Sequence, residues 1–232
     1  MRIVKKYWLP LLALVLACVA LTGAMAEEAV DPQELLHAVS GTYTELFPVI
    51  CAPEYDDVWL DRSAEYAGEE YAEMVAEILK SACTGEIMGQ EAVDAYTADP
   101  DSAVFDCYFT NGVSLFVFDG DVVRGLDEEG NVVFEHTYTY AGMLEGSLAC
   151  YMYKTEDADA GEFTYICLAP DTPDTTFHIE FRYGDDPEAL NEMTEGKYAY
   201  WMAAGIPVDA DEEMIYNCID LFAAENSPSG EE

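Results

Sequence analysis

Basic residues are scarce in this chain, which has nine lysines and arginines against 47 aspartates and glutamates and a formal net charge of −38 at pH 7. A surface this acidic repels the phosphates of nucleic acids and of anionic membranes, and it attracts cations. The composition therefore argues against a nucleic-acid-binding protein. Most acidic side chains are expected to form a solvated exterior, so the charge alone does not define a binding site.

The sequence motifs of several enzyme classes are missing as well. There is no G-x-S-x-G, no H-E-x-x-H and no glycine-rich phosphate loop, and we therefore expect a protein without catalytic activity. C-x-x-C is absent too, which argues against a thiolate zinc site or a redox motif. Histidine is rare, at three in the whole chain, namely His37, His136 and His178.

The N-terminus has the pattern of an export signal. Basic residues precede an apolar run from Tyr7 to Leu21, and Ala24-Met25-Ala26 follows as a cleavage site. The run is too short for a comfortable membrane span. We expect a signal peptide over residues 1–26, a single domain over 27–226 and a disordered acidic tail over 227–232. The alternative is a lipid anchor at Cys18, because Val15-Leu16-Ala17-Cys18 resembles a lipoprotein cleavage box.

Six cysteines remain after the predicted leader, an even number that favours up to three disulfides in an oxidising compartment. One pairing follows from the strands expected at Ser147–Lys154 and Phe163–Leu168. A hairpin that pairs Lys154 with Phe163 places Cys150 opposite Cys167. We therefore predict a disulfide between Cys150 and Cys167. Oxidised cysteines would not serve as metal ligands or nucleophiles.

A period of two dominates from Ala103 to Tyr183, and the intervening T-N-G, D-G-D and D-E-E-G segments are typical of hairpin turns. Consecutive antiparallel strands without intervening helices predict a lipocalin/calycin-like β-barrel or a strongly coiled sheet. Flanking helices are expected at Glu69–Cys83 and after Asp209, which would cap the last helix, so the fold class is mainly β with flanking helices (α+β). The expected strands are Ala103–Phe109, Val113–Phe118, Val122–Leu126, Val132–Tyr140, Ser147–Lys154, Glu162–Ala169 and Thr176–Tyr183.

The last of these strands carries a histidine beside a carboxylate. Alternation places Phe177, Ile179 and Phe181 on one face and Thr176, His178 and Glu180 on the other. Asp186 then caps a helix that begins at Pro187. The strand Val132–Tyr140 likewise places His136, Tyr138 and Tyr140 on one face.

These segments resemble the ZinT (YodA) family of exported metal-binding proteins. The family has H-F-H-I-F, then G-N-D, then L-L-x-E-M, and this chain has T-F-H-I-E-F, G-D-D and A-L-N-E-M in the same order. Gly41, Tyr43 and Pro48 match positions of the family's W-x-G-x-W-x-S-x-x-P pattern. The resemblance implies a calycin-like barrel that binds zinc or a similar divalent cation at one mouth.

The family holds its metal with both histidines of H-x-H and a third histidine in the loop before that strand. Here His178 matches the second position, Thr176 stands at the first, and the loop Leu168–Thr175 has no histidine. The ligand set that we expect is His178, inside the barrel mouth, with His136 and Glu180; the loop acids Asp171 and Asp174 are further candidates.

The function implied is metal buffering or delivery at the cell surface, by a secreted, periplasmic or lipid-anchored protein. The expected partners are the divalent metal ion and a metal-transport binding protein. Two alternatives stay open. Sixteen tyrosines and ten phenylalanines could line a cavity for a small apolar molecule, as in lipocalins. The chain could also be a degenerate module that binds a cell-surface partner.

Overall fold

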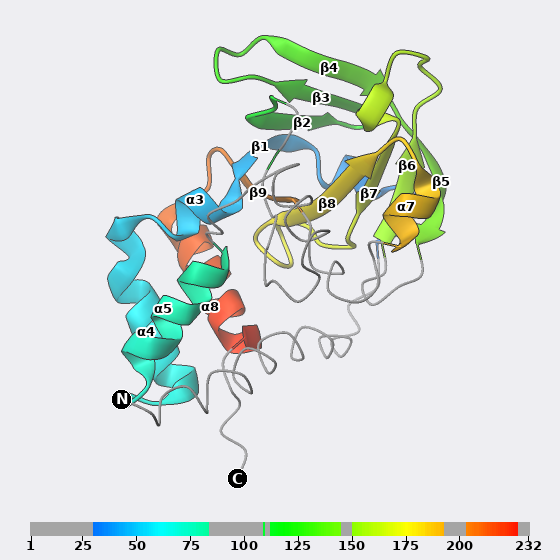
Figure 1. Ribbon diagram of the computed structural model, residues 1–232. Helices are drawn as coiled ribbons and strands as arrows, with labels where there is room; N and C mark the ends of the chain where they lie inside the picture. The colour runs from blue at the N-terminus through cyan, green and yellow to red at the C-terminus, as the bar shows by residue number, and fades with distance from the viewer. Residues whose placement is uncertain (1–29, 84–108, 110–111, 145–149, 193–202, 227–232) are drawn as a thin grey trace, which may run out of the picture.

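The structure, a computed structural model, describes residues 30–83, 109, 112–144, 150–192 and 203–226. Its main element is an antiparallel sheet of nine strands in the order β4-β3-β2-β1-β9-β8-β7-β6-β5 (Figure 1). The strands are β1 (Gly41–Glu45), β2 (Leu115–Asp119), β3 (Val122–Leu126), β4 (Val132–Thr137), β5 (Thr139–Leu144), β6 (Cys150–Lys154), β7 (Tyr165–Leu168), β8 (Ile179–Gly184) and β9 (Ala203–Pro207).

The sheet curls into a half-barrel. Its two edge strands, β4 and β5, are consecutive in the chain, with only Tyr138 between them. The Tyr138 hydroxyl is buried and donates a hydrogen bond to the carbonyl oxygen of Phe163, which fixes this corner. The predicted antiparallel, strongly coiled sheet is confirmed. Among the described residues no pairing joins β4 to β5, so the structure does not show a closed barrel.

Aromatic rings fill the concave side of the sheet. Phe116 lies with its ring centroid 4.6 Å from that of Phe181 and 5.7 Å from that of Phe134. Phe134 stacks on Phe163 at 3.9 Å, and Phe163 in turn lies 5.1 Å from Tyr183. These phenylalanines are buried by one another, so their large apolar area stabilises the curled sheet itself.

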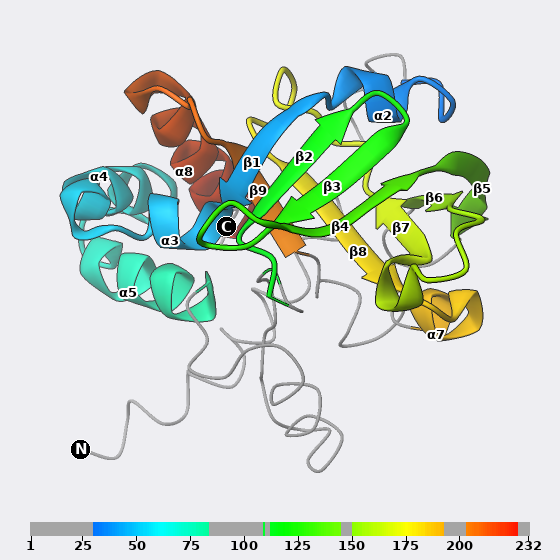
Figure 2. The ribbon, with the colours of Figure 1, turned by 90° about the horizontal axis from the view of Figure 1, so that it is seen from above.

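Helices gather beside β1 and β9 and pack on the other side of the sheet (Figures 1 and 2). They share a second apolar core with Ala204 and Ile206 of β9. Trp59 is fully buried in it and donates its indole N–H to the carbonyl oxygen of Ile50 at 2.6 Å. The helices of this core are α3 (Leu46–Ile50), α4 (Asp56–Ala67), α5 (Ala72–Cys83) and α8 (Glu212–Asn226), with the short 3-10 turn η3 (Pro53–Tyr55) between α3 and α4. Elsewhere, α2 (Leu35–Ala38) belongs to the concave core, α7 (Pro187–Glu192) contacts β8, and η4 (Gly161–Phe163) is a second 3-10 turn.

Several local predictions are confirmed. The strand expected at Val122–Leu126 is β3, and the helix expected at Glu69–Cys83 is α5, which begins at Ala72. The carboxylate of Asp186 accepts a hydrogen bond from the backbone N–H of Glu188 at 2.9 Å, as expected of the residue that caps α7.

Two boundaries differ from the predictions. The strand expected at Val132–Tyr140 divides at Tyr138 into β4 and β5, and Tyr140 is exposed instead of sharing the face of His136. The last helix is capped by Asp211, which accepts a hydrogen bond from the backbone N–H of Met214 at 2.9 Å, and not by Asp209. In both places the boundary of the element is set by a turn of the chain, and the periodicity of the residues says little about turns.

The predicted register of the β6–β7 hairpin is wrong by two residues. Lys154 pairs with Tyr165, because η4 takes Phe163 out of the strand, and Cys167 lies opposite Met152. Cys150 and Cys167 remain in one buried cluster but diagonal to each other, and the structure has both as thiols, without the predicted disulfide. Burial raises the pKa of each thiol to about 12, so neither is reactive at neutral pH.

The predicted leader, the acidic tail and nearly all of the strand expected at Ala103–Phe109 lie outside the described residues. Of the helices that the structure describes, none combines the length and the apolar character needed to cross a membrane.

Candidate metal site

The strand expected at Thr176–Tyr183 begins only at Ile179, so His178 lies just before β8. Phe177 has a backbone φ of 68°, in the left-handed region that costs a residue with a side chain roughly 1–3 kcal/mol. Its ring therefore packs in the helix-side core, whereas Ile179 and Phe181 belong to the concave core. The prediction that these three side chains share one face is wrong for Phe177. Such strain next to a buried histidine is typical of a functional position.

His178 lies between the sheet and α8. The side chain is only 5% exposed, its ring centroid is 5.5 Å from that of Phe222, and Nδ1 is 3.8 Å from Sγ of Cys218. Both neighbours belong to α8. The prediction that His178 lies inside the barrel mouth is wrong. Its side chain lies on the helix side of the sheet, against α8, whereas Ile179 and Phe181 face the concave core.

The two ring nitrogens of His178 have different partners. Nδ1 is 2.7 Å from the carbonyl oxygen of Thr176, which can only accept, so Nδ1 carries a proton and donates it. Nε2 faces the carboxylate of Glu180, with Oε1 at 3.5 Å. Two ligand atoms on one tetrahedral zinc ion, each bonded at about 2.0–2.1 Å, lie roughly 3.3 Å apart. The observed separation is therefore close to what a shared metal ion requires.

The charges of further acidic groups interact with this imidazole. Burial, and then the charge of Glu180, raises the pKa of Asp171 to about 6, while the nearby His178 opposes this. Burial and Glu180 likewise raise the pKa of Glu225 on α8. Burial opposes protonation of His178, but interactions with Cys218 and Glu180 outweigh it and hold its pKa well above the ordinary value. The carboxylate of Glu180 thus favours a positive charge at this buried imidazole, either a proton on Nε2 or a metal ion in its place.

The structure thus brings two of the residues predicted from the sequence into contact, His178 and Glu180, and the charge of Asp171 interacts with both. Asp174 is exposed, and none of the described contacts joins it to the histidine. Within the described ranges no group of three or more His, Cys, Asp or Glu side chains is already arranged as a metal shell. Glu180 is 25% exposed, so solvent reaches the Nε2 side and can supply water ligands.

Sequence reasoning missed Cys218 and Glu225. Both belong to α8, and spacings of four and three place Cys218, Phe222 and Glu225 on one helix face. That spacing was a usable signal. It was interpreted only as an apolar stripe, and the expectation of oxidised cysteines removed Cys218 from consideration.

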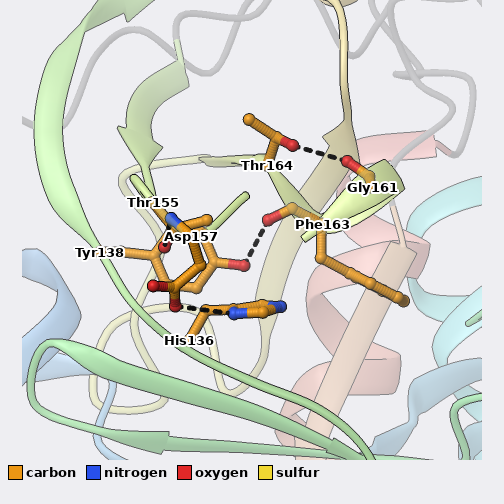
Figure 3. Close-up of polar contacts among 7 residues, drawn as sticks. All are labelled: His136, Tyr138, Thr155, Asp157, Gly161, Phe163 and Thr164. Carbon is orange, nitrogen blue, oxygen red and sulfur yellow. Dashed lines mark hydrogen bonds and ion pairs between the residues drawn. The ribbon is translucent and has the colours of Figure 1, made fainter. Parts of the chain in front are cut away.

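His136 is not brought to this site. It belongs to edge strand β4, where Nδ1 lies 2.9 Å from Oδ2 of Asp157 (Figure 3). Its ring lies nearly parallel to that of Phe134, with centroids 5.8 Å apart. The expected set of His178, His136 and Glu180 thus falls in two places: His178 beside Glu180, and His136 beside Asp157.

A curled antiparallel sheet with helices packed against its outer side defines a calycin-like α+β fold. The chain is similar to the Zn(II)-bound ZinT-like domain of Streptococcus pneumoniae AdcA, with 16% identity and a TM-score of 0.50 over 80% of this chain and 89% of that one. It also matches Zn(II)-bound AdcA from the same organism, with 15% identity and a TM-score of 0.44 over 87% of this chain and 39% of that one. No family model and no curated protein sequence matches. The likeness concerns the fold.

Proposed function

We propose that this protein is an exported, non-catalytic zinc-binding protein of ZinT type that buffers or delivers the metal at the cell surface. The observation that carries the proposal is the pairing of His178 Nε2 with Glu180 Oε1 at 3.5 Å, with Nδ1 held by the carbonyl oxygen of Thr176. A metal-binding histidine almost always donates its other N–H in this way, which fixes the tautomer and the ring orientation.

The ligands of the proposed site are His178 Nε2 and a carboxylate oxygen of Glu180. Asp171 or Glu225 would turn toward the ion as a third ligand, since the charges of both already interact with Glu180 and His178. Water would complete four-coordination. Zinc accepts this mixture of imidazole and carboxylate, and its binding displaces the proton that the apo site keeps on Nε2.

A coordination shell with few protein ligands suits transient metal binding better than storage. With two protein ligands in place and others that must move, the ion would exchange readily, as a buffer or a carrier requires. The Zn(II)-bound ZinT-like domain of AdcA has a similar fold and binds zinc. The export signal and a metal-transport partner remain predictions from the sequence and from the ZinT resemblance.

Zinc titration of the purified protein and of His178→Ala tests the proposal. The variant should lose the tight component, by about 100-fold or more, because losing even an outer-shell partner of a ligand typically costs 10–100-fold in metal affinity. His37→Ala is the matched control, because His37 is 55% exposed and, among the acids that the structure describes, pairs only with Asp121, at 3.4 Å. Its titration should match the wild type.

Glu180→Gln is a second test that remains valid if His178→Ala fails to fold. It preserves the size of the side chain and removes a ligand charge, so it should also weaken zinc binding, by at least about tenfold. Thermal unfolding of each variant shows whether the fold is retained. Zinc titrations of wild type, His178→Ala and Glu180→Gln that superimpose at moderate salt would overturn the proposed function.

A further inference from the structure

A second histidine faces a pocket that the His178 site does not use. The pocket has a volume of about 580 Å³ and lies between strand β4 and the segment around η4. Its floor includes Phe134 and Phe163, whose rings stack with their centroids 3.9 Å apart and so hold β4 against η4. The lining residues are Val132, Val133, Phe134, Glu135 and His136 on one wall and 159–163 on the other.

His136 has the geometry of a fixed ligand in this pocket. The side chain is 9% exposed, and Nδ1 lies 2.9 Å from Oδ2 of Asp157. Since a carboxylate accepts, Nδ1 donates its proton and the lone pair remains on Nε2. Figure 3 shows the ring's other nitrogen pointing away from Asp157, on the side of Phe163. Within the described part of the chain Nε2 makes no hydrogen bond or ion pair.

The loop that carries Asp157 is held by its own hydrogen bonds. The backbone N–H of Asp157 donates to Thr155 Oγ1 at 3.3 Å, and that of Ala160 donates to the carbonyl oxygen of Asp157 at 3.3 Å. The Thr164 hydroxyl bonds to the carbonyl oxygen of Gly161 at 2.6 Å (Figure 3). These contacts place Asp157 against the ring and present the exposed acids Asp159 and Glu162 on the pocket's second wall.

We propose that this pocket is a second, independent site for a hydrated divalent transition-metal ion. His136 Nε2 is its nitrogen ligand, and Asp157 positions the imidazole. The exposed side chains of Asp159 and Glu162 on the facing wall would turn toward the ion to supply carboxylate oxygens, since no three such groups in the described part of the chain are already arranged as a metal shell. A histidine whose far nitrogen is held by a carboxylate is the common arrangement around zinc. The pocket is much larger than a bare ion, so several waters stay in the coordination shell. The site does not depend on the His178 site.

Imidazole NMR of the purified protein resolves the two sites, because the chain has only three histidines. Zn²⁺ is added at about 150 mM salt, and the nitrogen resonances are assigned with His→Ala variants. We expect Nε2 of both His136 and His178 to shift, and the exposed His37 to stay in place. His136→Ala should remove one of two bound equivalents and leave the His178 signal responsive; His178→Ala should do the reverse.

Variants of surface acids show whether zinc is held by direct coordination in the pocket, by the general negative charge of the surface, or is lost through misfolding. Asp159→Asn with Glu162→Gln should weaken the His136 response at least about tenfold, and Asp157→Asn should weaken it by about 10–100-fold through the loss of positioning. Asp57→Asn with Glu77→Gln removes the same charge from exposed positions of α4 and α5 and should leave both sites unchanged.

Two outcomes would overturn the second site. One is an unshifted His136 resonance at zinc concentrations that saturate His178. The other is equal weakening by the pocket pair and the control pair, which would mean that diffuse surface charge holds the ion. A failure at His178 with a retained response at His136 would contradict only the function proposed above.

Discussion

At the scale of single residues, the position of one proton on His178 decides where a metal can bind. Nδ1 has two neighbours, the carbonyl oxygen of Thr176 at 2.7 Å and Sγ of Cys218 at 3.8 Å. The carbonyl is the closer and the stronger acceptor, so Nδ1 keeps its proton and points away from any metal. Cys218 is therefore a packing neighbour of the imidazole, and the metal belongs on the side of Glu180.

Replacement of Cys218 by alanine tests this assignment. Cys218→Ala removes the thiol next to Nδ1 and leaves Nε2 and Glu180 in place, so zinc affinity should change by no more than about threefold. The lost packing of this fully buried side chain should lower the free energy of unfolding by roughly 1 kcal/mol. Isothermal titration with zinc and urea unfolding measure the two effects. A large loss of affinity with an intact fold would place the thiolate in the metal shell and refute the assignment.

Period-two alternation correctly placed His178 beside Glu180, although β8 begins only at Ile179. The same reasoning placed the pair inside the barrel, and this failed. The sequence does not show that Phe177 adopts a left-handed backbone or that α8 lies over this part of β8. His136 was expected in the same ligand set, and the sequence does not show which loop, here that of Asp157, will approach it.

At the scale of the elements, the hairpin β3–β4 depends on a close approach at Gly125. A Cβ added there would clash with the ring of Phe134 and lie 2.9 Å from Cγ2 of Val113. Phe134 is fixed by its stack on Phe163, so it cannot move aside freely. The glycine therefore allows the aromatic core to reach the edge strand that carries His136.

Gly125→Ala should accordingly lower the free energy of unfolding by about 1–3 kcal/mol, the usual cost of overpacking. Urea unfolding measures this, and the imidazole spectrum of His136 should shift because Phe134 lies beneath it. Gly184→Ala is the control, since a Cβ there meets Leu190 at an ordinary 3.4 Å. Equal stability of the two variants would show that Phe134 is not locked in place.

Strands and helices were predictable where a regular period runs through them, as in β3 and α5. Registers were not, because they are set by turns. The three residues of η4 shift the β6–β7 pairing by two and move Cys150 away from the position opposite Cys167. Strand β9 and helix α4 were not predicted at all, since Ala203–Pro207 is short and lacks alternation, and α4 has acids within its apolar pattern.

At the scale of the whole molecule, a net charge of −38 attracts any divalent cation weakly. Two classes of zinc binding are therefore expected, one diffuse and one at defined ligands. Exposed charges are screened within about 10 Å at 0.1 M salt, whereas direct coordination is much less sensitive.

Zinc stoichiometry should thus fall as salt is raised from about 20 mM to about 500 mM, and the tight component should persist with little change in affinity. Titration at several salt concentrations, with wild type and His178→Ala side by side, measures both components. In His178→Ala the salt-sensitive part should remain. Parallel loss of all binding with rising salt would mean that the acidic surface alone attracts the metal.

The central claim is that the metal binds between His178 and Glu180, on the side of the sheet that α8 covers. Anomalous diffraction at the zinc edge, from crystals of the purified protein grown with zinc, locates the ion directly. We predict a peak about 2.0–2.1 Å from His178 Nε2 and within bonding distance of Glu180. A fully occupied peak elsewhere, with Nε2 of His178 without metal, would contradict the account.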